Sequence, residues 1–175
     1  EMEAFAVESH ERAVRAQAEG RFDNEIVPLD GLDRDEGPRE PNLDKIRSLA
    51  TLTPEGKITA AVASQISDGA AALVLMRESE AKAQGLTPLA RILGHESHAQ
   101  APGWFTTAPV PAAQKLLAKI GWTASDVDLW EVNEAFAVVP MAFMAEMGLA
   151  RDIVNVNGGA TALGHPIGAS GARII

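Results

Sequence analysis

The chain has no cysteine, few basic residues and no apolar stretch of transmembrane length. Without cysteine it cannot form a disulfide bond. The most apolar segment, Ala135–Met147, is interrupted by Pro140 and is too short to cross a bilayer, so we expect no membrane partner. Fifteen Lys and Arg against 24 Asp and Glu give a net charge of −9, which argues against a nucleic-acid partner.

The most informative segment is a glycine-rich stretch at residues 158–171, which contains His165. It follows Ile153–Asn157, a β-branched run typical of a buried strand, and Pro166 is a residue type favoured at the first position of a helix. The pattern predicts a strand, a tight turn and a helix, with His165 near the N-cap. Free N–H groups at a helix start favour developing negative charge and a neutral histidine, which could act as a base. Phosphate binding or simple tight packing, with His165 as a capping residue, also fits such a turn.

A second strand-to-helix junction is predicted at residues 133–134. Residues 126–132 alternate polar and apolar side chains, as a half-buried strand does, and an apolar helical pattern then continues to Met147. Asn133 and Glu134 would lie at the carboxyl end of a strand, where α/β proteins bind ligands. The structural alternative is that Asn133 caps the helix and Glu134 interacts with its dipole.

Together, Asn-Glu-Ala-Phe-Ala at 133–137 and Gly-Gly-x-x-x-x-Gly-His-Pro-x-Gly-x-x-Gly at 158–171 resemble the thiolase family closely. Residues 2–26 resemble the thiolase loop region, and residues 63–72 resemble the serine-containing segment that opens the C-terminal domain. The resemblance implies acyl transfer between coenzyme A thioesters, by condensation of two acyl-CoA molecules or thiolytic cleavage of a 3-ketoacyl-CoA. It also implies a layered α/β/α domain with a mixed sheet, here incomplete, preceded by a helical loop-domain segment.

The same resemblance assigns roles to single residues. His165 matches the histidine that activates the nucleophilic cysteine and contributes to an oxyanion hole, and Asn133 matches the asparagine that holds a water there. Ser64 matches the serine beside the pantetheine arm, while Ala135 and Phe136 match residues that line its tunnel. The coenzyme A thioester is a substrate, so no cofactor is expected.

Two further residues are candidates for substrate binding. Arg39 occurs where some thiolases have an arginine near a coenzyme A phosphate, although a solvated loop charge is the alternative. Phe105 follows Trp104 in the region that shapes the acyl pocket, where large aromatic side chains would favour a short acyl group such as acetyl. Both aromatic residues could instead anchor the core.

The absence of cysteine is the main departure from the family pattern. Thiolases use one cysteine as nucleophile and a second as acid and base, and neither is present. We therefore expect this chain alone to be inactive. The alternative function is a non-catalytic thiolase-like piece that binds acyl-CoA or a complementary chain. The resemblance further implies a cytoplasmic location and a homo-oligomer for the full-length form.

Other catalytic classes find little support in the sequence. There is no Gly-x-Ser-x-Gly segment, which argues against a serine hydrolase. His95 and His98 lack a third ligand at a suitable spacing, so no metal site is expected.

The predicted elements divide the chain into a part of the loop region, residues 1–58, and a truncated C-terminal domain, residues 59–175. Helices are expected over residues 2–19, 42–49, 79–84 and 111–120, from residue 68, from Asn133 to Met147 and after His165. Strands or extended segments are expected at residues 26–29, 58–63, 72–76, 89–94, 126–132 and 153–157.

Overall fold

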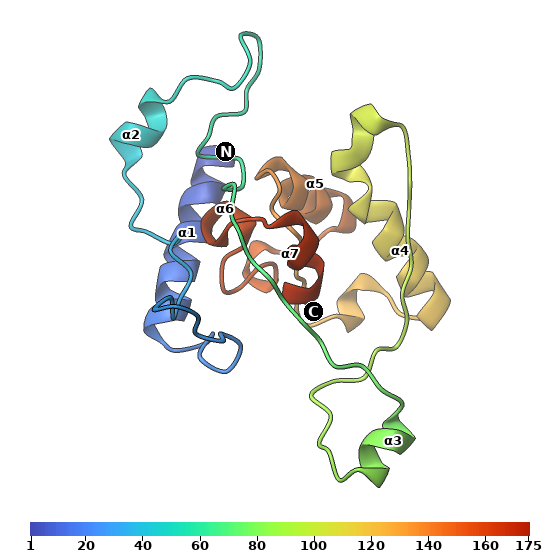
Figure 1. Cartoon of the computed structure of the whole chain (residues 1–175). Helices are drawn as coiled ribbons and strands as arrows, with labels where there is room; N and C mark the ends of the chain where they lie inside the picture. The colour runs from blue at the N-terminus through green and yellow to red at the C-terminus, as the bar shows by residue number, and fades with distance from the viewer.

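The computed structural model describes all 175 residues and consists of short helices joined by long irregular segments (Figure 1). The helices are α1 (Met2–Ala18), α2 (Leu43–Ser48), α3 (Glu78–Ala83), α4 (Pro109–Ile120), α5 (Val138–Met147), α6 (Ala160–Leu163) and α7 (Ile167–Arg173). Three 3-10 turns complete the list: η1 (Pro102–Thr107), η2 (Ala124–Asp126) and η3 (Arg151–Ile153). No helix combines the length and apolar character that a membrane crossing requires.

Helix α1 packs against α6 through a face of small residues (Figure 1). Ala6, Ala13 and Ala16 of α1 are almost completely buried, and Ala6 packs with Val62 and Ala137. Alanine lets two backbones approach closely and has the highest helix propensity, so one sequence feature serves both the formation and the packing of α1. The prediction of a helix over residues 2–19 is confirmed, and so are the helices at 42–49, 79–84 and 111–120.

The predicted strands do not form ladders. The paired β-residues are four isolated bridges, and only Trp130 and Val154 pair in the parallel sense. The Trp130 N–H donates to Ile153 O at 2.8 Å, and the Asn155 N–H donates to Trp130 O at 2.9 Å. The two predicted strands at 126–132 and 153–157 thus lie side by side as expected, but they are joined by one isolated β-bridge and form no ladder.

Residues 133–137 are not helical, contrary to the prediction that a helix begins at Asn133. They pair instead with residues 62–64: Ser64 N–H donates to Ala135 O at 3.0 Å and Ala137 N–H donates to Val62 O at 2.8 Å. These bonds use backbone groups that a helix would need for its own ladder. Helix α5 therefore begins only at Val138.

Between Gly69, which lies against Pro166, and Gly94, which lies against α4, the chain extends away from the rest of the molecule and carries α3 at its far end (Figure 1). The helix expected from residue 68 and the strands expected at 72–76 and 89–94 are absent. Val74 and Leu89 are 86% and 104% exposed, so these apolar residues have no partner surface to pack on. A strand is stable only when paired, which explains why the local pattern was misleading here.

Two small apolar clusters form the core. The first joins α4 and α5 to the bridged segments through Val110, Val132, Val139, Phe143 and Val154. The second joins α1 to the start of α5 through Phe5, Ala6, Val62 and Ala137.

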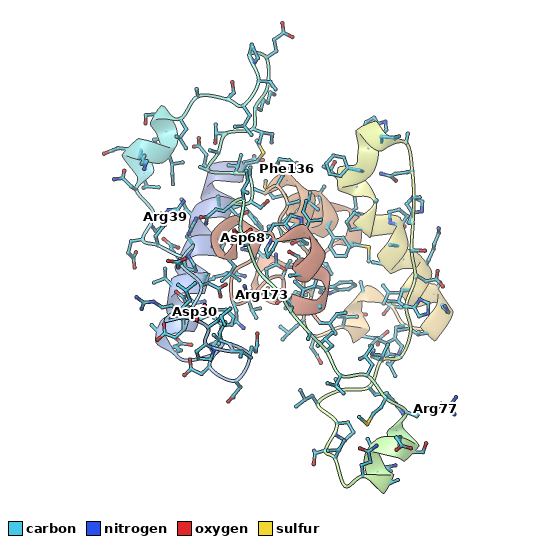
Figure 2. The ribbon with its side chains drawn as sticks, in the orientation of Figure 1. Asp30, Arg39, Asp68, Arg77, Phe136 and Arg173 are labelled. Carbon is cyan, nitrogen blue, oxygen red and sulfur yellow. The ribbon has the colours of Figure 1, made fainter.

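A bidentate ion pair ties α7 to the loop that precedes α2. Nη1 and Nη2 of Arg173, which is labelled in Figure 2, each donate to the Asp35 carboxylate at 2.6 Å. The Arg173 guanidinium also lies over the Phe22 ring. The hydrogen bonds that Arg173 donates to Asp35 hold the pKa of Arg173 above its ordinary value. Planar bidentate pairing fixes orientation as well as distance, so the loop and the helix are held in one arrangement.

His10 is buried within α1, although its charged sequence neighbours suggest the polar face of a helix. Its side chain is 7% exposed and Nδ1 has no hydrogen-bond partner. Burial, with a smaller contribution from the charge of Arg39, lowers the pKa of His10 from 6.5 to about 4. The native state therefore holds His10 neutral where the unfolded chain would protonate it.

We expect acid to destabilise the fold through His10. Between pH 6.5 and about 4 the unfolded chain binds a proton that the native chain excludes, so His10 by itself should lower the free energy of unfolding by about 3 kcal/mol over this range. The pKa of Glu131, which burial raises to about 7, contributes a slope of the opposite sign, so the His10 slope is the difference between a variant and the unmodified chain. Urea unfolding of His10→Leu at several pH values should lose this slope. His95→Leu, at an exposed position, should keep it; equal slopes in both variants would contradict the assignment.

Candidate functional site

The two motifs singled out in the sequence meet at one point. Nδ2 of Asn133 lies 3.3 Å from Nε2 of His165, and both side chains are partly buried. Asn133 follows the bridged residue Trp130, whereas His165 lies between α6 and α7. The two predicted strand ends therefore bring an amide and an imidazole from 32 positions apart into contact.

The other ring nitrogen of His165 faces a serine of α7. Nδ1 lies 2.6 Å from Oγ of Ser170, and Oγ lies 3.2 Å from Pro166 O, to which it can donate. If the serine hydrogen goes to the carbonyl and the Asn133 amide donates to Nε2, the ring proton must be on Nδ1. We assign this tautomer from the hydrogen-bond partners. It leaves Nε2 without a hydrogen, so that its lone pair accepts the Asn133 amide hydrogen.

His165 lies next to the N-cap of α7, as predicted. Pro166 is itself the N-cap and not the first helical residue, and the His165 N–H donates to Gln65 O at 3.2 Å. The alternative that Asn133 caps the following helix is wrong, because that helix begins at Val138.

The residues expected to line the pantetheine tunnel also lie together. Ser64 and Ala135 are joined by a backbone hydrogen bond of 3.0 Å, and Ala63 forms an antiparallel bridge with Phe136. The Phe105 ring packs edge-on against Phe136 with centroids 6.4 Å apart. Phe105 is nevertheless 57% exposed, so it is not the core anchor that the sequence alternative allowed.

Arg39 is connected to the segment that contains Ser64 by a hydrogen bond to Gln65. Its Nη1 donates to Gln65 Oε1 at 3.3 Å and to Gly37 O at 2.9 Å. Arg39 also lines an open cavity of about 550 Å³ whose charged residues include Arg34 and the acidic side chains of Asp33, Asp35, Glu36 and Glu40.

Gln65 connects the candidate residues to one another and was not identified from the sequence. Its Nε2 donates to Ala162 O in α6 at 2.9 Å, and its backbone oxygen accepts the N–H of His165. A side chain at Gly164 would collide with Ser67, so the segment after Gln65 lies directly on the turn before His165. Its position immediately after Ser64 is the only sequence signal that could have indicated it.

Glu134 is the second residue whose role the sequence did not reveal. Its side chain is completely buried, and its carboxylate accepts three hydrogen bonds. Ser9 Oγ donates to Oε2 at 2.7 Å, the Thr161 N–H donates to Oε2 at 3.1 Å, and Asn155 Nδ2 donates to Oε1 at 2.9 Å. These donors come from α1, from α6 and from the bridged segment, so Glu134 joins three parts of the fold.

Asn155 supports this arrangement from a left-handed backbone conformation with φ 48°. Its Oδ1 accepts the Val132 N–H at 2.7 Å, and its Nδ2 donates to Val132 O at 2.8 Å. Asparagine adopts left-handed geometry more readily than most residues, so its place before the Gly158–Gly159 pair is a usable sequence signal.

Two arginines surround the buried network with positive charge. Arg12 donates to Val154 O at 2.8 Å and to Asn155 O at 3.2 Å, and Glu8 forms ion pairs with both Arg12 and Arg151. Burial and the charge of Arg12 lower the pKa of Arg151, while the carboxylates of Glu8 and Glu134 oppose that shift. Opposite charges close to a buried carboxylate reduce the cost of removing it from water.

The chain belongs to the thiolase family. The family model described as "Thiolase, C-terminal domain" matches residues 86–175, and the one described as "Thiolase, N-terminal domain" matches residues 1–79. The resemblance inferred from the two motifs is thereby confirmed.

Curated relatives carry acyltransferase and thiolase names. A probable acetyl-CoA acetyltransferase of Dictyostelium discoideum is 46% identical over 100% of this chain and 45% of its own length. A steroid 3-ketoacyl-CoA thiolase of Mycobacterium tuberculosis is 47% identical over 99% of this chain and 44% of its own length. The chain thus spans less than half the length of these relatives.

Solved structures confirm the predicted thiolase-like α/β fold. A thiolase from Ascaris suum, solved in complex with coenzyme A, superposes with a TM-score of 0.95 at 43% identity, covering 99% of this chain and 47% of that one. The acetyl-CoA acetyltransferase of Bacillus anthracis gives a TM-score of 0.92 at 40% identity, covering 99% and 46%.

We predict that a methyl group at Gly159 destabilises the fold. A Cβ there would lie 2.6 Å from Glu134 Oε1, which is held by its hydrogen bonds. Gly159→Ala should lower the free energy of unfolding in urea by about 1–3 kcal/mol, as overpacking does. Gly168→Ala is the matched control, because Gly168 lies in α7 with open space around it, and it should be neutral or stabilising. Equal effects at both positions would contradict the close packing on Glu134.

Proposed function

We propose that this chain provides the oxyanion-stabilising and coenzyme A-binding part of a thiolase-type acyltransferase site. The observation that carries this proposal is the 3.3 Å contact between Asn133 Nδ2 and His165 Nε2, in a chain whose relatives are named acetyl-CoA acetyltransferases and 3-ketoacyl-CoA thiolases. The reaction is condensation of two acyl-CoA molecules or thiolytic cleavage of a 3-ketoacyl-CoA.

In the first step His165 acts as a base. Nε2 exchanges the hydrogen bond from Asn133 for the proton of a thiol, which leaves a thiolate that is a far better nucleophile. Ser170 accepts the Nδ1 hydrogen at 2.6 Å and so keeps the lone pair on the nitrogen that faces the site. The 175 residues contain no cysteine, so none of their side chains supplies this thiol.

In the second step of thiolytic cleavage the thiolate sulfur attacks the 3-keto carbonyl carbon of the 3-ketoacyl-CoA, and the carbonyl π electrons move to oxygen. The resulting oxyanion accepts hydrogen bonds from the protonated Nε2 of His165 and from Asn133, directly or through a water. Collapse of the intermediate re-forms the carbonyl as a new thioester and breaks the C2–C3 bond, and the acetyl-CoA enolate that leaves takes up the proton that Nε2 removed from the thiol. A single donor of this kind contributes roughly 3–4 kcal/mol to the transition state.

Substrate binding in this proposal uses the surface beside the reacting pair. Ser64, Ala135 and Phe136 contact the pantetheine arm, and Arg39 interacts with a phosphate of coenzyme A. Phe105, packed on Phe136, limits the acyl pocket to a short group such as acetyl. The connection from Arg39 through Gln65 to the backbone N–H of His165 supports a continuous binding surface.

The second candidate function is binding of acyl-CoA, or of a complementary chain, without turnover. The absence of cysteine favours it, since neither of the family's two thiols is available within these residues. The two candidates differ in one measurable property, which is whether His165 and Asn133 accelerate attack of a thiol on the 3-keto carbonyl of a bound 3-ketoacyl-CoA.

An assay with an added small thiol separates the two functions. Without a thiol we expect no cleavage of acetoacetyl-CoA by the chain, followed by its absorbance. With N-acetylcysteamine, acceleration that falls by about 10²–10³-fold in His165→Ala and in Asn133→Ala would support acyl transfer. His95→Ala is the control. Saturable binding of acetoacetyl-CoA with no acceleration would instead favour the binding function.

Arg39 provides a separate test of coenzyme A binding. In calorimetric titrations Arg39→Ala should bind coenzyme A roughly fivefold more weakly, the loss of about 1 kcal/mol expected for one exposed charge-assisted contact. Arg77→Ala removes the same charge at the N-cap of α3, far from Arg39 in Figure 2, and should bind like the unmodified chain. Equal affinities for both variants would exclude Arg39 from the binding surface.

A further inference from the structure

The Glu134 carboxylate is next to the reacting pair, yet the proposed acyl transfer gives it no role. It is completely buried, whereas the adjacent Asn133 is only partly buried and contacts His165. A carboxylate is costly to bury and is usually retained only where its hydrogen bonds serve a purpose.

The three partners of Glu134 all present hydrogens to it. Ser9 Oγ already accepts the Gly159 N–H at 3.0 Å, so its own hydrogen points to Oε2. The Asn155 amide cannot turn over, because its oxygen accepts the Val132 N–H while its nitrogen donates to both Val132 O and Glu134. The Thr161 backbone N–H is the third donor. Both carboxylate oxygens must therefore act as acceptors.

This network holds Asn133 from both sides. Asn155 clamps the backbone N–H and C=O of Val132, and the side chain of Glu134 is fixed by its three donors. In extended backbone, neighbouring side chains point to opposite sides, so anchoring the residues before and after Asn133 directs its amide toward His165.

The same carboxylate also fixes the segment that carries His165. Its Oε2 accepts the N–H of Thr161, in the first turn of α6, and His165 follows directly after Gly164 at the end of that helix. Glu134 is thus next to Asn133 in the chain and is hydrogen-bonded to the segment that carries His165. The relative position of these two segments determines the distance from Nδ2 of Asn133 to Nε2 of His165.

We propose that Glu134 is a positioning residue that sets the Asn133–His165 contact, with Ser9 of α1 as its supporting partner. The catalytic role of this contact rests on the proposed function. The contact between Asn133 and His165 itself can be tested without substrate. The requirement is specifically for two acceptor oxygens, so glutamine, which has the same shape, should fail to substitute.

Nitrogen-15 NMR of the histidine rings provides the readout. In Glu134→Gln one carboxylate oxygen becomes an NH₂ group that faces a fixed donor, either Asn155 or the Ser9 and Thr161 pair, so the network cannot close. We expect the Nε2 resonance of His165 to move most of the way to its position in Asn133→Ala, where the hydrogen bond is removed outright. Glu146→Gln, an exposed site on α5, is the charge-matched control and should leave this resonance unchanged.

A second variant keeps the test valid if Glu134→Gln does not fold. Ser9→Ala removes one donor to Glu134 and the link to Gly159 but leaves the carboxylate in place. It should move the Nε2 resonance in the same direction by a smaller amount, while the His95 and His98 resonances report an intact fold. A His165 Nε2 resonance identical to that of the unmodified chain in a folded Glu134→Gln or Ser9→Ala variant would overturn the proposal.

Coenzyme A titration of the unmodified chain tests the proposed function separately. Absence of binding would remove that function, whereas a shifted Nε2 resonance in the variants would still establish the positioning role.

Discussion

A carboxylate that is completely removed from water must be surrounded by hydrogen-bond donors, and Glu134 imposes this requirement on the whole centre of the molecule. The features around it follow from the need to bring donors close. Gly159 has no side chain because the carboxylate occupies that space, and Asn155 adopts a left-handed conformation that turns its amide inward. Helix α1 presents Ser9 among small residues, so that its backbone can approach α6.

The site depends on this arrangement for more than stability. An oxyanion site works because its donors are already in place when charge develops, so that no reorganisation is needed during the reaction. Asn133 and His165 come from segments that share only one bridge, Trp130 to Val154. Such a short pairing would leave their separation loosely determined. The hydrogen bonds to Glu134 fix the separation of these two segments, as the ladder of a longer sheet would otherwise do.

The meeting of Asn133 and His165 could be predicted because each residue follows its own strand-like segment, and neighbouring parallel segments end at the same edge. Helices such as α1 and α4 were predicted because their periodicity and terminal residues are local. Strands were not, since residues 72–76 and 89–94 have the right composition but no partner within reach. The roles of Glu134 and Gln65 depend on partners as distant as Ser9, 125 positions away from Glu134, and no local pattern encodes such a contact. The helix predicted from Asn133 was displaced for the same reason, because residues 62–64 take up its backbone groups.

The ion pair between Asp35 and Arg173 gives the site a mechanical property. The loop that it anchors continues through Gly37 to Arg39, and the helix that it anchors contains Ser170, whose hydroxyl meets the imidazole. The loop that carries Arg39 and the helix that carries Ser170 are therefore held together by a planar bidentate pair, so a displacement of one is coupled to a displacement of the other.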